Sequence, residues 1–286
     1  MKIDIIGAGS MGIVLSYFLR SKNDIVLIVK KGESPSYQNG LVLRNGGTEE
    51  RFSVGVSETT GDPDITIVSV KSYDLEKVYR EYDLRGNVIL VQNGLSHLVT
   101  ESRGFTKIYA VTTWGAKKIS KGVAELTGKG YFRVGSDSVR IDISFLREAG
   151  INAEWVDNIR EELYRKAAIN AVINPITSLF GVKNGVVANS RELWSIASET
   201  IKELDELFTK LGYHLEIEKN VLETCRVTSE NTSSMLQDLQ QGRMSENDSI
   251  TGEIISLGRK NGMEMKVNTF LYESIKFLQS HNKNTN

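Results

Sequence analysis

One short segment of the chain places a lysine and two asparagines at regular intervals. Lys166, Asn170 and Asn174 recur every four residues in RKAAINAVINP (165–175), so they are expected on one face of an α-helix. The residues between them are alanine, isoleucine and valine. Burying an unpaired polar group costs roughly 2–7 kcal/mol, so the pattern predicts a polar ligand beside this face. Pro175 is expected to end the straight helix, because a proline disfavours the α conformation of the residue before it.

These side chains suit the reduction of a carbonyl group. Such a reduction develops negative charge on the carbonyl oxygen, which an ammonium group stabilises and then protonates. We therefore expect Lys166 to donate the proton and the asparagines to hold substrate oxygens, the alternative being a helix lysine that extends into solvent. Histidine often supplies such a proton, but the three histidines form no comparable pattern, and His97 is expected on a helix surface.

A glycine motif lies near the beginning of the chain. Gly7, Gly9 and Gly12 form G-x-G-x-x-G directly after the apolar segment 3–6. In a dinucleotide site the first glycine permits a tight turn, the second lets backbone approach the pyrophosphate, and the third lets helix and strand pack closely. The N-terminus of the following helix favours phosphate. The alternative is a glycine-rich turn that binds no ligand.

The end of the second predicted strand distinguishes between two dinucleotides. NAD sites usually carry an acidic residue there, for the ribose hydroxyl groups. Here the strand at 24–29 is followed by Lys30 and Lys31. Two cations suit a 2′-phosphate, so we predict NADP(H), with NADPH preferred over NADH. Alternatively both lysines are solvated at a strand end, with Glu33 close by.

The first half of the chain alternates short β-branched runs with helical segments, which predicts a parallel sheet with helices on its faces. Strands are expected at 3–6, 24–29, 41–43, 52–54, 65–70 and 87–92. Lys71 and Asn93 follow two of these strands, and ligands of open α/β folds bind at the carboxyl ends of strands. For Asn93 the alternative is a plain Asn-Gly turn. Segments 123–126 and 131–135 are expected to form a β-hairpin.

The second half has a different character. From residue 158 onward no segment has the pattern of a strand, and helical spacing recurs at 191–211, 215–228, 233–241 and 246–260. A chain of 286 residues is long enough for two domains. We therefore predict an α/β fold with a Rossmann-like dinucleotide-binding domain over residues 1–157 and an all-α domain over residues 158–286.

Composition limits the partners. The chain carries 35 basic and 36 acidic residues, a net charge of -1, so we expect neither nucleic acid nor a membrane as partner. No apolar run reaches the ~18 residues of a membrane-spanning helix. One cysteine, Cys225, excludes an internal disulfide and fits the reducing cytoplasm. No metal site is predicted, and an exposed apolar helix face favours a homodimer.

A polar cluster follows near residue 231. Asn231, Ser233 and Ser234 lie at a predicted helix start, where hydroxyl groups cap the helix and free N–H groups bind anions. Simple capping by Ser233 or Thr232 is the alternative. Glu246 comes after a short break, where a carboxylate also suits the start of the next helix.

Together these motifs resemble the ketopantoate reductase (2-dehydropantoate 2-reductase) family. The resemblance covers nearly the whole chain and is carried by GAGSMG at 7–12, VKSYD around Lys71, QNGL around Asn93, ELYRKAAINAVINPITSLF around Lys166, the Asn-Gly pair at 184–185 and NTSSMLQD…R…SE at 231–246. Lys30 stands roughly where the family often has an arginine, so the charge is kept and the bidentate fork is lost.

The resemblance implies NADPH-dependent reduction of 2-dehydropantoate, a small 2-oxo acid, to (R)-pantoate on the route to pantothenate and coenzyme A. It implies Lys166 and Glu246 as catalytic residues. The implied substrate-binding residues are Asn93, Asn170, Asn174, Asn184, Asn231 and Ser234. The implied cofactor-binding residues are Gly7, Ala8, Gly9, Ser10, Met11, Gly12, Lys30, Lys71, Asn93, Ala116 and Glu246. Two alternatives stay open: an NAD(P)H-dependent reductase of another 2-oxo acid, and a nonenzymatic NADP-binding sensor.

Overall fold

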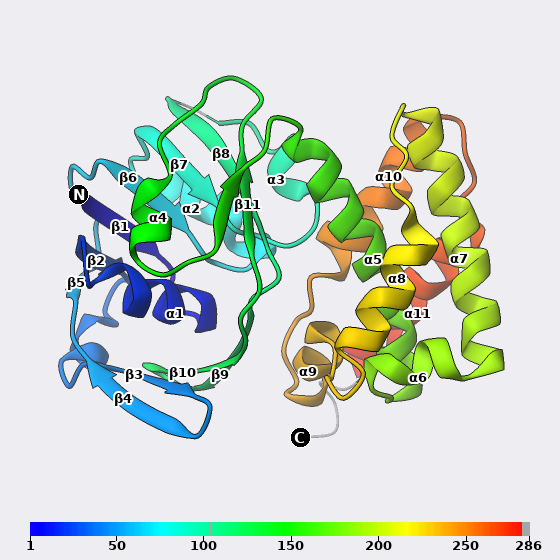
Figure 1. Ribbon diagram of the computed structural model, residues 1–286, viewed down its shortest axis with the longest axis horizontal. Coiled ribbons are helices and arrows are strands. Elements are labelled where there is room, and N and C mark those ends of the chain that lie inside the picture. The colour runs from blue at the N-terminus through cyan, green and yellow to red at the C-terminus, as the bar shows by residue number, and fades with distance from the viewer. Residues whose placement is uncertain (103, 282–286) are drawn as a thin grey trace. The chain divides into compact units, whose positions relative to one another are not determined.

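The computed structural model describes residues 1–102 and 104–281, which divide into two compact units (Figure 1). The first unit comprises residues 1–92 and 100–159, and the second comprises residues 93–99 together with those from 160 onward. The last passage between the units lies at 159/160. Segment 93–99, expected in the first domain, belongs to the second unit. The chain therefore passes between the units at three positions: 92/93, 99/100 and 159/160.

The first unit is built on a sheet whose eight strands have the order β12-β11-β8-β7-β6-β1-β2-β5 within the described residues. These strands are β1 Lys2–Ile6, β2 Asp24–Ile28, β5 Gly55–Ser57, β6 Ile65–Val68, β7 Gly86–Leu90, β8 Phe105–Thr112, β11 Phe132–Gly135 and β12 Ala153–Trp155. From β5 to β8 every neighbouring pair is parallel, whereas β11 runs antiparallel to β8. The order β5-β2-β1-β6-β7-β8 is that of a doubly wound dinucleotide-binding sheet, with its switch point between β1 and β6.

The central strands are mostly apolar because helices cover both faces of such a sheet. Ile3, Ile5, Leu27 and Ile67 are at most 1% exposed. The helical segments of this unit are α1 Ser10–Leu19, η1 Ser34–Tyr37, η2 Ser72–Asp74, α2 Leu75–Glu81 and α4 Ser144–Glu148. The predicted Rossmann-like α/β half is confirmed.

A smaller sheet of the first unit has the order β4-β3-β10-β9 and packs against α1. Its strands are β3 Leu41–Asn45, β4 Thr48–Phe52, β9 Gly115–Ser120 and β10 Val123–Gly128. The predicted hairpin of 123–126 with 131–135 is wrong. Both edges of β10 are taken, by β9 and β3, while β11 pairs with β8 in the larger sheet. Strand periodicity specifies which faces are buried and does not specify the partner strand.

The second unit is helical, and no strand occurs among its described residues, as predicted. Its elements are α3 Ser96–Val99, α5 Ile159–Phe180, α6 Asn184–Asn189, α7 Arg191–Lys210, α8 Ile217–Val227, α9 Ser234–Gln240, the π-helical segment η3 Asp248–Gly252, α10 Glu253–Lys260 and α11 Lys266–His281. No helix in the described part of the chain combines the length and the hydropathy needed to cross a membrane.

Helix α5 corrects the expectation for Pro175. The helix continues through this proline to Phe180, although an internal proline costs about 3 kcal/mol or more. The turn is held by burial, since Ile173 and Ile176 are at most 2% exposed. The Thr177 hydroxyl also donates to Ser233 Oγ at 2.7 Å. Tertiary packing therefore overrides the local preference.

Candidate active site

The glycine loop between β1 and α1 has the geometry that a bound pyrophosphate requires. Gly7 has φ +109°, a conformation that side chains rarely adopt. A Cβ on Gly12 would lie 1.9 Å from the Gly7 carbonyl oxygen, so only glycine allows this approach of helix to strand. Around Gly9 nothing lies within 4 Å of a built Cβ, which leaves space for a ligand. Ser10 and Met11 begin α1, whose N-cap is Gly9.

Two polar side chains that the sequence analysis missed hold the strand ends around this loop. Ser69 Oγ donates to the carbonyls of Ile6 and Gly7, at 3.1 and 3.0 Å. Gln92 Nε2 donates to the Val68 carbonyl at 2.7 Å and to that of Val70 at 3.2 Å. The position of Gln92 before Asn-Gly, at a predicted strand end, was the available signal.

The predicted cations lie in the first unit, on both sides of the glycine loop. Lys30 follows β2 and Lys71 follows β6, the two neighbours of β1 in the sheet. Lys30 is exposed, with its Nζ 3.8 Å from Asp74 Oδ2. Glu33, which weakened the NADP interpretation, forms an ion pair with Lys121 at 3.3 Å. Lys30 therefore lies at the end of β2, next to β1, with an exposed ammonium group near the Asp74 carboxylate.

Two residues expected at the cofactor are placed as follows. Ala8 lies inside the glycine loop, and Ala116 lies near the start of β9, a strand that packs against α1. Both side chains pack against the apolar core of the first unit. Asn93 and Glu246, which the resemblance also assigned to the cofactor, belong to the helical unit.

Lys166 lies on α5 in a setting that disfavours its charge. Burial lowers the pKa of its ammonium group from the usual 10.5 to about 8, while the charge of the Glu246 carboxylate acts in the opposite direction. The residues on either side, Arg165 and Ala167, differ in role. Arg165 binds Glu161 and Glu162, and Ala167 is buried. Lys166 is thus a cation near neutral pH that gives up its proton readily.

Glu246 and Asn93 meet beside this lysine within the helical unit. Asn93 Nδ2 donates to Glu246 Oε2 at 3.1 Å, and the glutamate is 6% exposed. The two residues are 153 positions apart in the sequence, so the fold alone brings them together. An amide donor on a buried carboxylate stabilises the charged form. The structure therefore joins three predicted site residues.

The asparagines of the helical unit include amide atoms with no hydrogen-bond partner among the described residues. Asn170 is partly exposed one turn after Lys166. Asn174 is 5% exposed, and its Nδ2 has no hydrogen-bond partner among the described residues. Asn184 begins α6 and donates to Thr228 Oγ1 at 2.9 Å, while its Oδ1 has no partner in the described part of the chain. Leaving a buried amide unpaired costs about 1–3 kcal/mol, which a polar ligand would recover.

The start of α9 is capped by a serine, and the segment before it is hydrogen-bonded to the start of α6. Ser233 caps α9 by accepting from the Leu236 N–H group at 3.3 Å, so simple capping is the correct interpretation of Ser233. Ser234 is exposed at the first position of α9. Asn231 is also exposed, and its carbonyl accepts from the Asn184 N–H group at 3.0 Å. The predicted substrate residues of α6 and α9 are therefore connected through backbone.

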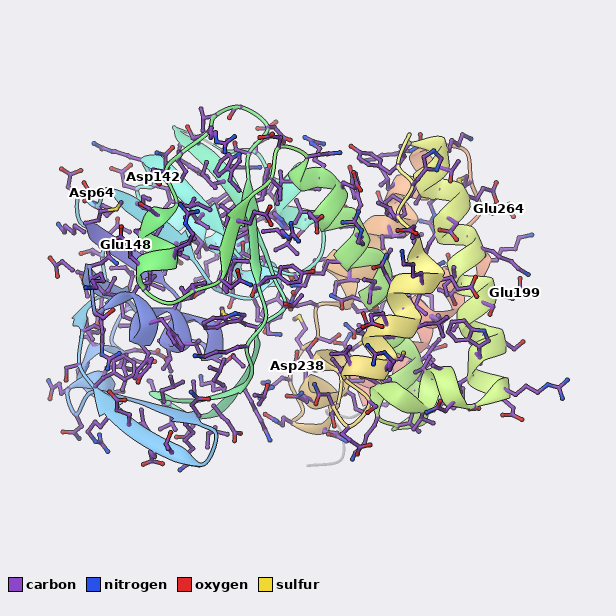
Figure 2. The ribbon with its side chains drawn as sticks, viewed as in Figure 1. Asp64, Asp142, Glu148, Glu199, Asp238 and Glu264 are labelled. Atoms are coloured by element: carbon purple, nitrogen blue, oxygen red, sulfur yellow. The ribbon has the colours of Figure 1, made fainter. Side chains whose placement is uncertain are left out.

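The turn from α9 toward Glu246 is fixed by a charge pair. Figure 2 shows Asp238 on α9, where it is 3% exposed. Arg243 donates to Asp238 Oδ1 through Nε at 2.9 Å and Nη2 at 2.8 Å. Such bidentate donation to a buried carboxylate fixes geometry as well as charge.

The expectation for His97 is wrong. This residue lies on α3 and is 0% exposed, so it is buried rather than on a helix surface. The reason is that segment 93–99 packs into the helical unit instead of following the first-domain sheet.

Comparison with known proteins agrees with this arrangement. The family model "Ketopantoate reductase PanE/ApbA" matches residues 3–138, and the model of the C-terminal part of that family matches residues 158–279. The chain is 31% identical over 290 residues to 2-dehydropantoate 2-reductase of Archaeoglobus fulgidus, covering 98% of each chain.

Solved structures have the same fold. The crystal structure of a probable 2-dehydropantoate 2-reductase from Bacillus subtilis matches with TM-score 0.85 and 27% identity, covering 97% of this chain and 100% of that one. D-mandelate dehydrogenase in a ternary structure with NADH and anilino(oxo)acetate matches with TM-score 0.88 and 23% identity, covering 99% and 100%, a likeness of fold. With a glycine loop for a dinucleotide and a lysine beside a buried carboxylate, the chain belongs to the ketopantoate reductase family of oxidoreductases.

Proposed function

We propose that this protein reduces 2-dehydropantoate to (R)-pantoate with NADPH, in the synthesis of pantothenate and coenzyme A. The observation that carries the proposal is Lys166, whose ammonium group has a pKa of about 8 beside the Glu246 carboxylate. A proton donor works best when its pKa lies near the working pH. The 31% identical relative named 2-dehydropantoate 2-reductase supports the choice of substrate.

In this mechanism the helical unit binds the acid and supplies the proton. Lys166 Nζ stabilises the developing oxyanion and then protonates it. Glu246 holds the lysine in its charged form, and Asn93 holds Glu246. Asn170, Asn174, Asn184, Asn231 and Ser234 are proposed to bind the carboxylate and hydroxyl groups. The unpartnered amide atoms of Asn174 and Asn184 suit a substrate that carries a hydroxyl group as well as the 2-oxo acid.

The first unit is proposed to hold the cofactor, which supplies hydride when bound. Gly7 to Gly12 would accept the pyrophosphate at the N-terminus of α1. Lys30 would bind the 2′-phosphate, and Lys71 and Ala116 would line the rest of the cofactor-binding site. The open space around Gly9 fits this assignment.

A second candidate is a reductase of another 2-oxo acid that uses NADH. It is favoured by the fold shared with D-mandelate dehydrogenase, solved with NADH. A nonenzymatic sensor is disfavoured because Lys166, Glu246 and Asn93 are all present and in contact through charge or hydrogen bonding.

The deciding experiment follows NADPH absorbance with 2-dehydropantoate, with 2-oxo-2-phenylacetate, the oxidised partner of mandelate, and with NADH in place of NADPH. We expect kcat/KM for 2-dehydropantoate to exceed that for the phenyl acid by at least ~100-fold, because buried polar groups left unpaired penalise an apolar substrate. Faster turnover of the phenyl acid, or of another 2-oxo acid, would exclude the proposed substrate.

Lys30→Ala is expected to raise the KM for NADPH about tenfold and to leave that for NADH unchanged. The reason is that one charge-assisted contact to the 2′-phosphate is worth about 1.5 kcal/mol. Lys22→Ala serves as control, since Lys22 is exposed and follows the far end of α1. Equal effects on both dinucleotides would show that Lys30 does not bind the 2′-phosphate.

We further infer a cytoplasmic homodimer. Support comes from the exposed apolar side chains of α11, where Phe270 and Phe277 are 66% and 60% exposed and share a face seven residues apart. The single cysteine, Cys225, is buried, which suits a reducing compartment.

A further inference from the structure

The π-helical segment η3 lies next to Glu246 and contacts the segment that carries Asn93. In η3 the Glu253 N–H group donates to the Asp248 carbonyl, five residues back. Such widened turns occur frequently at functional sites. The Ser249 carbonyl, inside this turn, accepts from the Leu95 N–H group at 2.7 Å.

Gly94 makes this approach possible. It has φ +82°, and a Cβ built on it would lie 2.2 Å from the Ser249 carbonyl oxygen and 2.6 Å from the carbonyl carbon. Real Cβ atoms essentially never come within 3.0 Å of such atoms. Any side chain at position 94 must therefore move segment 93–99 away from η3.

Two bonds join the same two segments in register. Asn93 Nδ2 binds Glu246 Oε2 at 3.1 Å, and two residues further on Leu95 N–H binds the Ser249 carbonyl. Within the η3 side, Ser249 Oγ donates to the Glu246 carbonyl at 3.1 Å. The Asn93 side chain thus holds the Glu246 carboxylate. Ser249, whose carbonyl contacts Gly94 and Leu95, holds the Glu246 backbone.

We propose that the close contact of Gly94 and Leu95 with the Ser249 carbonyl positions Glu246 beside Lys166, which makes Gly94 a positioning residue of the site. The inference rests on the proposed function for its catalytic consequence. Its structural part, the hold of segment 93–99 on Glu246, stands on the contacts alone.

Among the surrounding carboxylates, Glu246 is the one whose charge acts on the pKa of Lys166. On α5, Arg165 is bonded to Glu161 and Glu162. On η3, Asp248 accepts from Tyr272 Oη at 2.8 Å. The charge that raises the pKa of Lys166 is that of Glu246. Displacing Glu246 therefore lowers the pKa of Lys166.

The test compares Gly94→Ala with Gly212→Ala in the full-length protein. Gly212 belongs to the same unit and has φ +85°, but nothing lies within 4 Å of its built Cβ. Both variants place an alanine at a similar positive φ, and only the first loses the contact. The pKa of Lys166 is measured without substrate, from the pH dependence of its labelling by an amine-reactive reagent, read by peptide mass spectrometry. We expect Gly94→Ala to lower this pKa by at least ~0.5 unit and Gly212→Ala to leave it unchanged.

A second variant avoids the steric change if Gly94→Ala fails to fold. Replacing Leu95 by its α-hydroxy acid converts the amide to an ester and removes only the N–H group that binds Ser249. The same replacement at Leu211, whose N–H group binds the Leu207 carbonyl at 3.1 Å, is the matched control. A lowered pKa of Lys166 in the Leu95 ester alone supports the proposal.

An unchanged pKa of Lys166 in folded Gly94→Ala, or in the Leu95 ester, overturns it. A shift of equal size in the control variants overturns it too. In Gly94→Ala and in the Leu95 ester, the lowered pKa of Lys166 should reduce kcat at pH 8, whereas the KM for NADPH should stay constant. If the wild-type protein reduces no 2-oxo acid, the proposed function fails, whereas the labelling experiment still decides the role of Gly94.

Discussion

Lys166→Met is expected to lower kcat for 2-dehydropantoate by at least ~10²-fold, because proton donation and oxyanion stabilisation disappear together. The KM for NADPH should change little, since the glycine loop lies in the other unit. In the wild-type protein the donor must be protonated, so kcat should fall as the pH rises above about 8, the pKa of Lys166. Stopped-flow measurement of NADPH oxidation between pH 6 and ~10 tests both statements.

The control for this variant is Lys202→Met, at an exposed lysine on α7 that pairs with Glu199. It removes the same charge from the same unit and should retain full activity. A near-normal rate for Lys166→Met would show that another group supplies the proton.

The second large effect concerns stability. The double variant Lys166→Met/Glu246→Gln is expected to be more stable than the single variant Glu246→Gln. Its free energy of unfolding at pH 7 should be higher by on the order of 3 kcal/mol. The pKa of Lys166 lies at about 8 in the folded protein against 10.5, a difference of about 2.5 units at ~1.36 kcal/mol each. Removing the carboxylate lowers the folded pKa further, so the penalty does not shrink in this background.

The sign of the pH dependence follows from the folded pKa lying below the unfolded one. The charge penalty is fully present below pH 8 and disappears as the pH rises toward 10.5. Urea unfolding of Glu246→Gln and of the double variant should therefore show a difference in the free energy of unfolding at pH 7 that becomes small at pH ~10. The Glu246→Gln background is needed because a buried carboxylate without its partner is itself costly. Equal stability at pH 7 would mean that Lys166 carries no burial penalty.

Much of the fold was predictable because its signals are local. The strand of apolar residues before Gly7 and the helix after Gly12 follow from periodicity and glycine geometry. The change to an all-helical half follows in the same way. The partner of β10 was not predictable, since pairing with β9 and β3 depends on residues far away in the sequence.

The site shows the same limit. Lys166, Asn170 and Asn174 were identifiable because one helix carries them all. The family resemblance assigned Asn93 and Glu246 to the site separately, and the bond between them was not predicted, as it spans 153 positions. Gly94 could not be singled out from the sequence, because its close approach to the Ser249 carbonyl arises only in the folded chain. The continuation of α5 through Pro175 likewise depends on tertiary burial.

The chain passes between its units three times, which limits how the helical unit can be exchanged by recombination of gene segments. The helical unit is not one uninterrupted stretch of gene, because segment 93–99 is encoded inside the other unit. A recombination event that joined a new second half at residue 160 would replace Glu246 but keep Asn93, its hydrogen-bond partner. Exchange of the sequence after residue 160 therefore does not exchange the whole helical unit, because segment 93–99 stays behind with the first half.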